Sequence, residues 1–368
     1  YLQNNQTPVK DTFVIPRQWW MFSGRISKPI GYFVSFQNGF DTFSMLDVFL
    51  DLDFNPKLRA RIGRFKTPFT YEFLVEPIQG LVVPERSVFF NNFGQNRDLG
   101  VMAFGRLLNS TVDYAGGIFN GTRNGFLAQQ DNKYTSWFAN WRPFGQEENT
   151  LFENLNIGGS VFAGNQNQAT LPQTLRTVVP TTGNAILGVP FLGFNNNIRE
   201  FGPMAFWDLH LAYFYEGLAL ISEWGSGFQD YATTTGTTRT RVPVDSFYVQ
   251  ASYLITGETR SSIGIVKPNN PVSFGRGKGW SGIGAIEPYA RYEYMDISNR
   301  VFTAGLADPN LWANRMFQTH VGVAWHLTQY LKFFFDWNHA EFNQPVIFAP
   351  NRRQLTSDMF MARLQLYF

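Results

Sequence analysis

The sequence predicts an all-β chain that closes into a transmembrane antiparallel β-barrel. Residues 358–368 alternate between apolar and more polar side chains, and a period of two is the side-chain period of a strand. Segments of similar pattern recur along all 368 residues. Aromatic residues make up 17% of the chain and charged residues only 16%, against a usual share of about 25%. Few charges and many aromatics are typical of a wall that faces lipid.

The last strand carries the most information about compartment. One of its faces is wholly apolar and ends on an aromatic residue: Phe360, Ala362, Leu364, Leu366 and Phe368. The other face holds Met359, Met361, Arg363, Gln365 and Tyr367. Such a strand is typical of the closing strand of bacterial outer-membrane β-barrels, so we place the protein in that membrane. Helices and closed barrels are the structures that satisfy every backbone group in lipid. No run approaches the roughly 18 apolar residues of a spanning helix.

About fifteen strands of some ten residues are visible, separated by clusters of Gly, Asn, Pro, Asp and Thr. We place them at 17–27, 30–38, 44–54, 57–66, 98–106, 110–120, 134–143, 155–164, 204–216, 217–229, 244–256, 283–297, 314–327, 330–342 and 356–368. Short connections such as Asn55–Pro56 alternate with the long segments 67–97, 121–133, 165–203, 230–243, 298–313 and 343–355. Short turns at one rim and long loops at the other are the outer-membrane pattern. One segment, 257–282, is long on the side where short turns are expected.

The number of strands predicts a further strand. Bacterial barrels have an even number of strands and both termini in the periplasm. If Phe368 is periplasmic, strand 17–27 runs from the outside inward and needs a partner strand before it. Residues 1–13 are rich in Asn, Gln and Pro and are typical of a loop, although they are the other place for that strand. We therefore expect sixteen strands, with the first upstream of residue 1, in a single domain over 1–368.

Several classes of site are excluded or disfavoured by residue content. There are no cysteines, which excludes disulfides, thiolate metal sites and cysteine nucleophiles. A net charge of +2 creates no strong field for nucleic acid. The four histidines are scattered, and we expect them to line a lumen rather than bind metal. The Gly-rich run 275–279 lacks a phosphate-binding loop's strand–loop–helix setting, and no Gly-x-Ser-x-Gly elbow is present. We expect no cofactor and no enzymatic activity.

Particular segments resemble the phosphate-selective porins O and P. They are Gly63–Phe69, then Glu85–Ser87 with Gly94 and Arg97–Val101, the segment Asp245–Glu258 with its strand end Thr256–Glu258, and Pro288–Asp296. The resemblance covers most of 17–105 and 204–368. It implies a 16-stranded trimeric porin whose first strand would precede residue 1, and a lysine-rich inward loop that confers anion specificity. This sequence departs from that pattern, because 67–97 contains no lysine.

Basic residues on the early strands are candidate pore-lining groups. Of the 30 Lys and Arg residues 22 are Arg, whose planar fork of donors binds oxyanions. Alternation puts Lys57, Arg59 and Arg61 on one face, and charge on a lipid face costs ~2–4 kcal/mol, so this face should be the lumen. Arg17 and Arg25 join them from strand 17–27. A basic wall selects anions.

A structural role for these arginines is the alternative. A tight turn at Asn55–Pro56 sets Asp53 opposite Arg59 and Asp51 opposite Arg61. Opposite charges across an antiparallel pair stabilise it by roughly 0.2–1 kcal/mol. The arginines could then neutralise acidic neighbours, contact ions, or do both.

Segment 67–97 is the candidate pore-constricting loop, with Arg86 and Arg97 as its ion contacts. Loops of this length are usually functional or disordered. The alternative constriction is 121–133, with Arg123 and Lys133, and either segment could instead form an external cap.

We therefore expect an outer-membrane porin for passive diffusion of small hydrophilic solutes and ions, with a preference for anions or phosphate. Its expected partners are outer-membrane lipid or lipopolysaccharide and, by the resemblance, two further copies in a homotrimer. Two other classes stay open. A soluble all-β binding or structural protein would show the same alternation, and an outer-membrane β-barrel enzyme would need a catalytic constellation.

Overall fold

The computed structural model describes residues 2–3, 13, 15–39, 42–126, 131–148, 150–178, 188–275, 279–349 and 352–368. Within these ranges one antiparallel sheet of sixteen strands dominates, in the order β1-β20-β19-β18-β17-β14-β13-β12-β9-β8-β7-β6-β5-β4-β3-β2. Its first half comprises β1 (Leu2–Gln3), β2 (Gln18–Ser27), β3 (Ile30–Gly39), β4 (Thr42–Asn55), β5 (Leu58–Lys66), β6 (Arg97–Leu107), β7 (Val112–Phe119) and β8 (Tyr134–Trp141). Its second half comprises β9 (Asn154–Ala169), β12 (Ile198–Tyr215), β13 (Leu218–Thr233), β14 (Thr240–Tyr253), β17 (Ala285–Ile297), β18 (Arg315–His326), β19 (Leu331–Ala349) and β20 (Arg352–Leu366).

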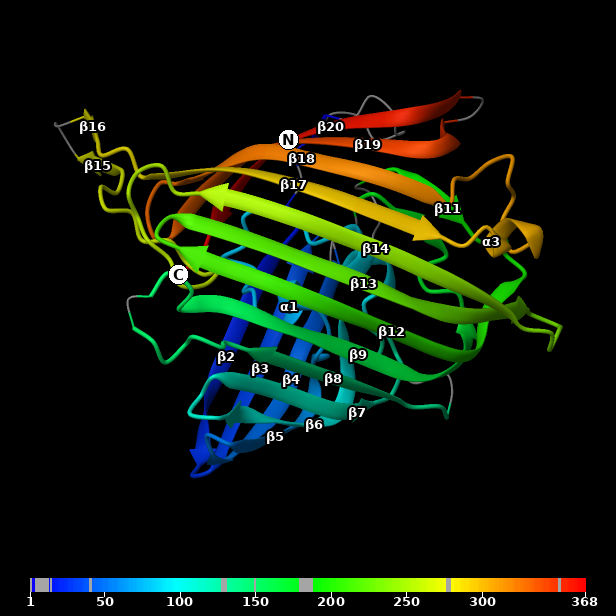
Figure 1. The fold of residues 1–368 in the computed structure, drawn as a ribbon, viewed down its shortest axis with the longest axis horizontal. Coiled ribbons are helices and arrows are strands. Elements are labelled where there is room, and N and C mark those ends of the chain that lie inside the picture. Colours follow the sequence, from blue (N-terminus) through cyan, green and yellow to red (C-terminus); the bar gives the residue numbers. More distant parts are fainter. Residues whose placement is uncertain are drawn as a thin grey trace.

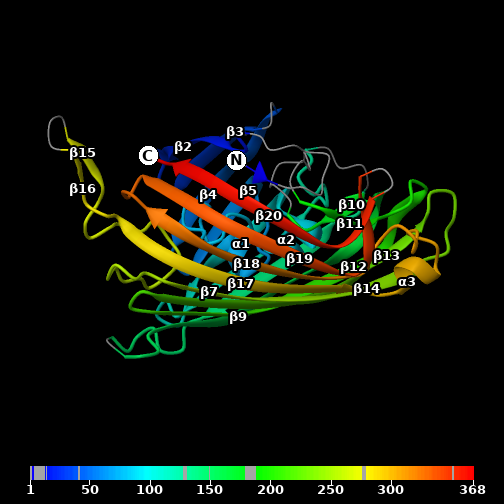
Figure 2. The ribbon, with the colours of Figure 1, turned by 90° about the horizontal axis from the view of Figure 1, so that it is seen from above.

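The remaining elements lie in the connections. They are the hairpins β10–β11 (Thr174–Arg176, Pro190–Gly193) and β15–β16 (Ser273–Gly275, Gly279–Ser281) and the short helices α1 (Tyr71–Leu74), α2 (Val88–Phe93) and α3 (Arg300–Thr303). The sheet curls around α1 and α2, so the transmembrane β-barrel predicted from the sequence is confirmed (Figures 1 and 2). No helix in the described ranges is long and apolar enough to cross a membrane.

All fifteen strands placed from the alternation are present, with bounds shifted by a few residues. The short strand β1 pairs with β20, Leu2 opposite Met361 and Gln3 opposite Phe360. This is the position expected for the first strand of the barrel. A full first strand upstream of residue 1 stays a prediction, and most of residues 1–13 fall outside the described ranges.

Alternating exposure explains why these segments form a barrel wall. Along β14 the side chains of Phe247, Val249 and Tyr253 are exposed, whereas Tyr248 and Gln250 between them are buried. The exposed row is apolar and faces lipid, and the buried row faces the interior. Neighbouring strands pair their backbone groups, which is the condition for a sheet in hydrocarbon.

The two rims of the barrel differ. We call the end at which β20 finishes the C-terminal rim, and the other end the opposite rim. Turns 28–29, 56–57 and 216–217 at the C-terminal rim are short, whereas the opposite rim carries the long connections 67–96 and 170–197. The predicted asymmetry is confirmed at these connections. The prediction that 230–243 and 343–355 are long loops is wrong, because β13 extends to Thr233 and β14 begins at Thr240, while β19 extends to Ala349 and β20 begins at Arg352. Two connections at the C-terminal rim, 142–153 and 254–284, are nevertheless long.

Part of the barrel interior is packed rather than open. Connection 67–96, which includes α1 and α2, folds inside the wall (Figure 2). Its aromatic side chains pack with those of the inner face. The Phe69 ring lies 4.6 Å from Phe162 on β9, and the Phe93 ring lies 5.4 Å from Phe206 on β12, centroid to centroid. This apolar core inside the barrel was not predicted, and it holds the loop on the side of β8–β20.

Segment 254–284 covers the loop from the C-terminal rim. Ile263 is buried in the same apolar core, and the Arg260 guanidinium lies 2.7 Å from the Glu287 carboxylate on β17. The backbones of Gly80 and Gly264 approach so closely that a Cβ atom on Gly80 would lie 2.9 Å from the Cα atom of Gly264. The long connection that looked misplaced in the sequence is therefore a support for the inward loop.

Candidate functional site

The inward loop 67–96 is attached to the inner wall by polar contacts with several strands. Most of them use backbone groups of the loop. Wall side chains in these contacts are Ser136 on β8, Ser160 on β9, Glu223 on β13, Glu293 on β17, Lys332 on β19 and Arg363 on β20. Contacts this widely spaced hold the loop across the lumen at a fixed height.

Helix α1 begins at a wall carboxylate. Glu223 accepts hydrogen bonds from the backbone N–H groups of Tyr71 at 2.7 Å and Glu72 at 2.9 Å. The Tyr248 hydroxyl donates to the same carboxylate at 2.6 Å. The first N–H groups of a helix have no hydrogen-bond acceptor within the helix, so a carboxylate from the wall serves as their acceptor.

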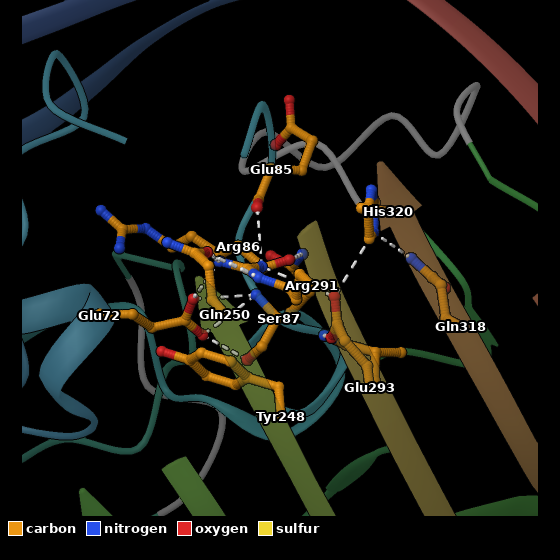
Figure 3. Close-up of polar contacts among 12 residues, drawn as sticks. Glu72, Glu85, Arg86, Ser87, Tyr248, Gln250, Arg291, Glu293, Gln318 and His320 are labelled. Carbon is orange, nitrogen blue, oxygen red and sulfur yellow. Dashed lines mark hydrogen bonds and ion pairs between the residues drawn. The ribbon is translucent and has the colours of Figure 1, made fainter. Parts of the chain in front are cut away.

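Helix α2 is fixed by a second cluster, shown in Figure 3. Ser87 caps the helix by accepting from the Phe90 N–H at 3.2 Å, and its own N–H donates to the Glu72 carboxylate at 3.0 Å. Glu293 accepts from the Val88 N–H at 2.6 Å. Arg291 lies between these groups and donates to the Glu85 carbonyl at 3.1 Å. The two helices and the wall thus share one hydrogen-bonded network.

Two carboxyl groups of the loop are buried. Burial raises the pKa of Glu72 to about 7, although Arg291 opposes the change. Burial raises the pKa of Glu76 to about 8, and the Glu72 charge adds to the effect. Both groups therefore change charge near neutral pH.

The wall of β2–β5 carries the basic residues predicted from the sequence. The predicted cross-strand pairing is confirmed, with Asp53 opposite Arg59 and Asp51 opposite Arg61. Arg25 also reaches Asp53, at 2.9 Å, so one carboxylate serves two guanidinium groups. Arg61 donates two hydrogen bonds to Asp51 and stacks over the Phe49 ring.

A second triad of the same kind was missed. Asp113 on β7 lies 3.2 Å from Arg106 on β6 and 3.2 Å from Arg142, which directly follows β8. Arg106 and Asp113 are opposite each other in the β6–β7 hairpin. The cross-hairpin reasoning that paired Asp53 with Arg59 would have found this pair, because both strands were placed correctly. The wall thus carries two Arg–Asp–Arg triads.

The other predicted site residues lie elsewhere. Lys57 is exposed in the turn between β4 and β5. Arg17 is largely buried and lies 2.6 Å from Glu85 of the loop, and Arg97 is buried and lies 3.0 Å from Asp47. Arg86 is buried with its guanidinium over the Phe73 ring. The structure therefore brings Arg25, Lys57, Arg59 and Arg61 to one wall and buries Arg17, Arg86 and Arg97 around the loop.

Exposure separates the two sides of the lumen. In the triads the side chains of Arg25, Arg59 and Arg106 are 60%, 43% and 63% exposed. Inner side chains of the far wall, such as Arg291 and Lys332, are 2% and 0% exposed. Water reaches the charged wall of β2–β8, whereas the loop covers the opposite wall.

The alternative segment and the histidines do not form a competing site. Arg123, in the described part of 121–133, donates to the Gly94 carbonyl at 3.2 Å and so supports the inward loop. His320 and His326 face the interior, at 3.0 Å from Asp336 and 2.9 Å from Glu287. In the described ranges no three His, Asp or Glu residues are placed to hold a metal ion.

Comparisons with known proteins agree with this geometry. Residues 194–368 match the family described as phosphate-selective porin O and P. A search of curated protein sequences found no match.

Solved structures share the fold at low sequence identity. A complex of Salmonella typhi OmpF with daunomycin is 10% identical, with a TM-score of 0.57 and coverage of 99% of this chain and 94% of that one. Pseudomonas putida OprB at high pH is 9% identical, with a TM-score of 0.56 and coverages of 92% and 82%. An anion-selective porin from Comamonas acidovorans is 10% identical, with a TM-score of 0.52 and coverages of 95% and 89%. Residues 194–368 thus resemble the phosphate-selective porins O and P, and the chain as a whole has the β-barrel fold of the bacterial outer-membrane porins.

Proposed function

We propose that this porin conducts small anions passively, along the exposed wall of β2–β8. The observation that carries the proposal is the pair of Arg–Asp–Arg triads. Each triad holds two guanidinium groups on one carboxylate, so each has a net charge of +1. Their exposure leaves N–H donors free for a solute, and a guanidinium presents these donors in a fork that fits oxyanions.

The aspartates in the triads have a positioning role. Asp53 and Asp113 each hold two long side chains against the wall, which reduces the freedom lost when an anion binds. A row of fixed positive charges in a narrow, partly apolar lumen raises the local concentration of anions. Lys57 and Arg61 belong to the same wall and lie two positions before and two positions after Arg59 of the first triad.

Segment 67–97 is, in this proposal, the element that narrows the channel. Its core contacts fill the β8–β20 side and leave solutes the charged side. Arg86 and Arg97 are buried, so we assign them to holding the loop. Direct ion contact by Arg86 and Arg97 is the competing account, and it requires the loop to expose them.

Reversal potentials in a planar bilayer under a salt gradient test the proposal. The native protein should show anion preference, and Arg59→Glu and Arg106→Glu should each shift the reversal potential toward cations. Arg86→Glu would produce the larger shift under the competing account. Arg315→Glu is the matched control, because Arg315 pairs with Asp296 on the outer face as Arg59 pairs with Asp53 on the inner face. Cation preference of the native protein would overturn the proposal.

Assembly and catalysis need separate measurements. The family resemblance supports a homotrimer in the outer membrane, and the mass of the protein–detergent complex in light scattering tests it. The contacts of the inner polar residues are structural, which supports transport without catalysis. Measurable hydrolysis of a lipid or ester substrate by the purified barrel would contradict that part of the proposal.

A further inference from the structure

Four arginines gather on the outer face of the barrel at the opposite rim. They form the rim arginine patch, which consists of Arg199 on β12, Arg239 in the β13–β14 connection, Arg241 on β14 and Arg300 on α3. β12, β13 and β14 are neighbours in the sheet, and α3 follows the next strand, β17 (Figure 1). The patch lies outside the lumen, because Arg199 and Arg241 are on the outward rows of β12 and β14, and Arg239 and Arg300 contact residues of these same rows.

The guanidinium groups of the patch lie flat against the wall. The Phe201 ring contacts two of them, with Arg199 at 4.2 Å and Arg239 at 5.2 Å from its centroid. The guanidinium of Arg241 lies 3.8 Å from the Phe228 centroid, and Arg300 reaches the Arg241 carbonyl at 3.5 Å. Such cation–π contacts keep the positive groups near the surface of the barrel instead of extended into water.

The patch lies at the edge of the lipid-facing band. Farther along the same outward rows toward the C-terminal rim, past Pro203, Ala205, Ser226, Pro243 and Asp245, the side chains are large, apolar and exposed: Trp207, Leu209, Trp224, Phe247 and Val249. Aromatic and aliphatic rows mark the depth of the hydrocarbon, and the groups directly beyond them meet lipid headgroups. The patch is therefore at headgroup depth on the side opposite the C-terminal rim.

Charge in the patch is incompletely balanced. Asp230 accepts from Arg241 at 2.8 Å and is the carboxylate within the patch. Beyond it Asp245 faces Asp296, which pairs with Arg315. The Nη atoms of Arg199 donate to the Asn167 side chain and the Gly236 carbonyl, whereas Arg239, Arg241 and Arg300 are exposed. Four guanidinium groups with one carboxylate leave donors of the type that binds phosphate in a bidentate manner.

We propose that the rim arginine patch binds the phosphate groups of an anionic glycolipid in the outer leaflet. A lipid fits better than free phosphate because the outward rows that carry the patch lead to the apolar band. One ligand can then place phosphates on the guanidinium groups and acyl chains on Trp207 and Leu209. Clusters of basic residues at a membrane surface bind anionic lipid headgroups by the same attraction between opposite charges.

Thermal unfolding of the full chain in detergent, titrated with lipid, tests the inference. The probes are bisphosphorylated lipid A, the same lipid without its phosphates, and inorganic phosphate. The variant Arg199→Gln/Arg239→Gln removes two patch charges, and Arg352→Gln/Arg353→Gln removes two exposed charges at the same rim on β20. Neither pair belongs to the proposed channel wall.

The expected result is that bisphosphorylated lipid A alone raises the unfolding temperature of the native protein. The patch variant should need about tenfold more lipid for the same stabilisation, a loss of roughly 1.4 kcal/mol, and the control variant should match the native protein. Equal titrations for the patch variant and the native protein would overturn the inference. So would equal stabilisation by dephosphorylated lipid A or by inorganic phosphate.

Discussion

The Glu223 carboxylate on β13 lies 2.7 Å from the backbone nitrogen of Tyr71, a residue 152 positions earlier in the chain. This contact begins helix α1, and the carboxylate also accepts from the Glu72 N–H and the Tyr248 hydroxyl. A wall residue thus fixes where the inward loop starts its first turn. The position of the loop depends on a few long-range contacts of this kind.

Replacing Glu223 by Gln should loosen the loop. The amide keeps the size of the side chain but loses the charge that strengthens two backbone hydrogen bonds, each worth about 1.5–3 kcal/mol with a charged acceptor. Arg86 is the one Lys or Arg in 67–96, so trypsin cleavage after Arg86 reports loop opening. We expect cleavage to be about tenfold faster, since proteolysis follows the open population. Glu216→Gln, at an exposed turn, is the control, and equal rates for both variants would contradict the expectation.

Lys332→Met should have a similar effect through a different anchor. The buried ammonium of Lys332 donates to the carbonyls of Gln79 and Leu81, both at 2.8 Å. Methionine fills the same space but leaves these carbonyls without a donor, which costs about 1–3 kcal/mol per group. Trypsin cleavage after Arg86 should again accelerate. Lys332 and Glu223 contact separate parts of the loop, so the free-energy change of the double variant should equal the sum of the two single changes. A change in the double variant that is much smaller than this sum would disprove independent anchoring.

Most of the wall could be predicted from the sequence because lipid imposes a strict pattern. A strand such as β14 must alternate, since its outer residues meet hydrocarbon and its inner residues do not. The pair Asp53–Arg59 was predictable for the same reason, because a tight turn fixes which residues are opposite. The same rule applies to Arg106 and Asp113, although that pair was missed.

The packed interior could not be predicted, because alternation says nothing about what covers the inner face. Phe162 and Phe206 are inward residues of β9 and β12, and they contact Phe69, Phe89 and Phe93 of the loop. Phe69 and Phe206 are 137 positions apart, so no local pattern links them. For the same reason the burial of Arg86 and Arg97, predicted as ion contacts, became visible only in three dimensions.

Gly80→Ala should disturb the support under the loop. A Cβ atom at Gly80 would lie 2.9 Å from the Cα and backbone nitrogen of Gly264, so one of the two segments must shift. Overpacking of this kind costs typically 1–3 kcal/mol. Gly264→Ala is a matched control, because its Cβ atom would have no heavy atom within 4 Å. Gly80→Ala should lower the thermal unfolding temperature and Gly264→Ala should leave it unchanged, and the reverse order would show that the two backbones do not meet.

The stability of the loop should fall as the pH rises through neutrality. Burial raises the pKa of Glu76 to about 8 in the folded protein, from an unfolded value near 4.5. The folded state therefore favours the neutral acid, so this contribution is complete below about pH 4.5, declines at higher pH and is lost as the pH passes 8. Glu76→Gln mimics the neutral acid at every pH. At pH 4 the thermal unfolding temperatures of the native protein and the variant should be similar, and at pH 9 the native protein should unfold at the lower temperature. If the two curves run parallel from pH 4 to pH 9, the Glu76 carboxylate is ionised and stabilised in the folded loop.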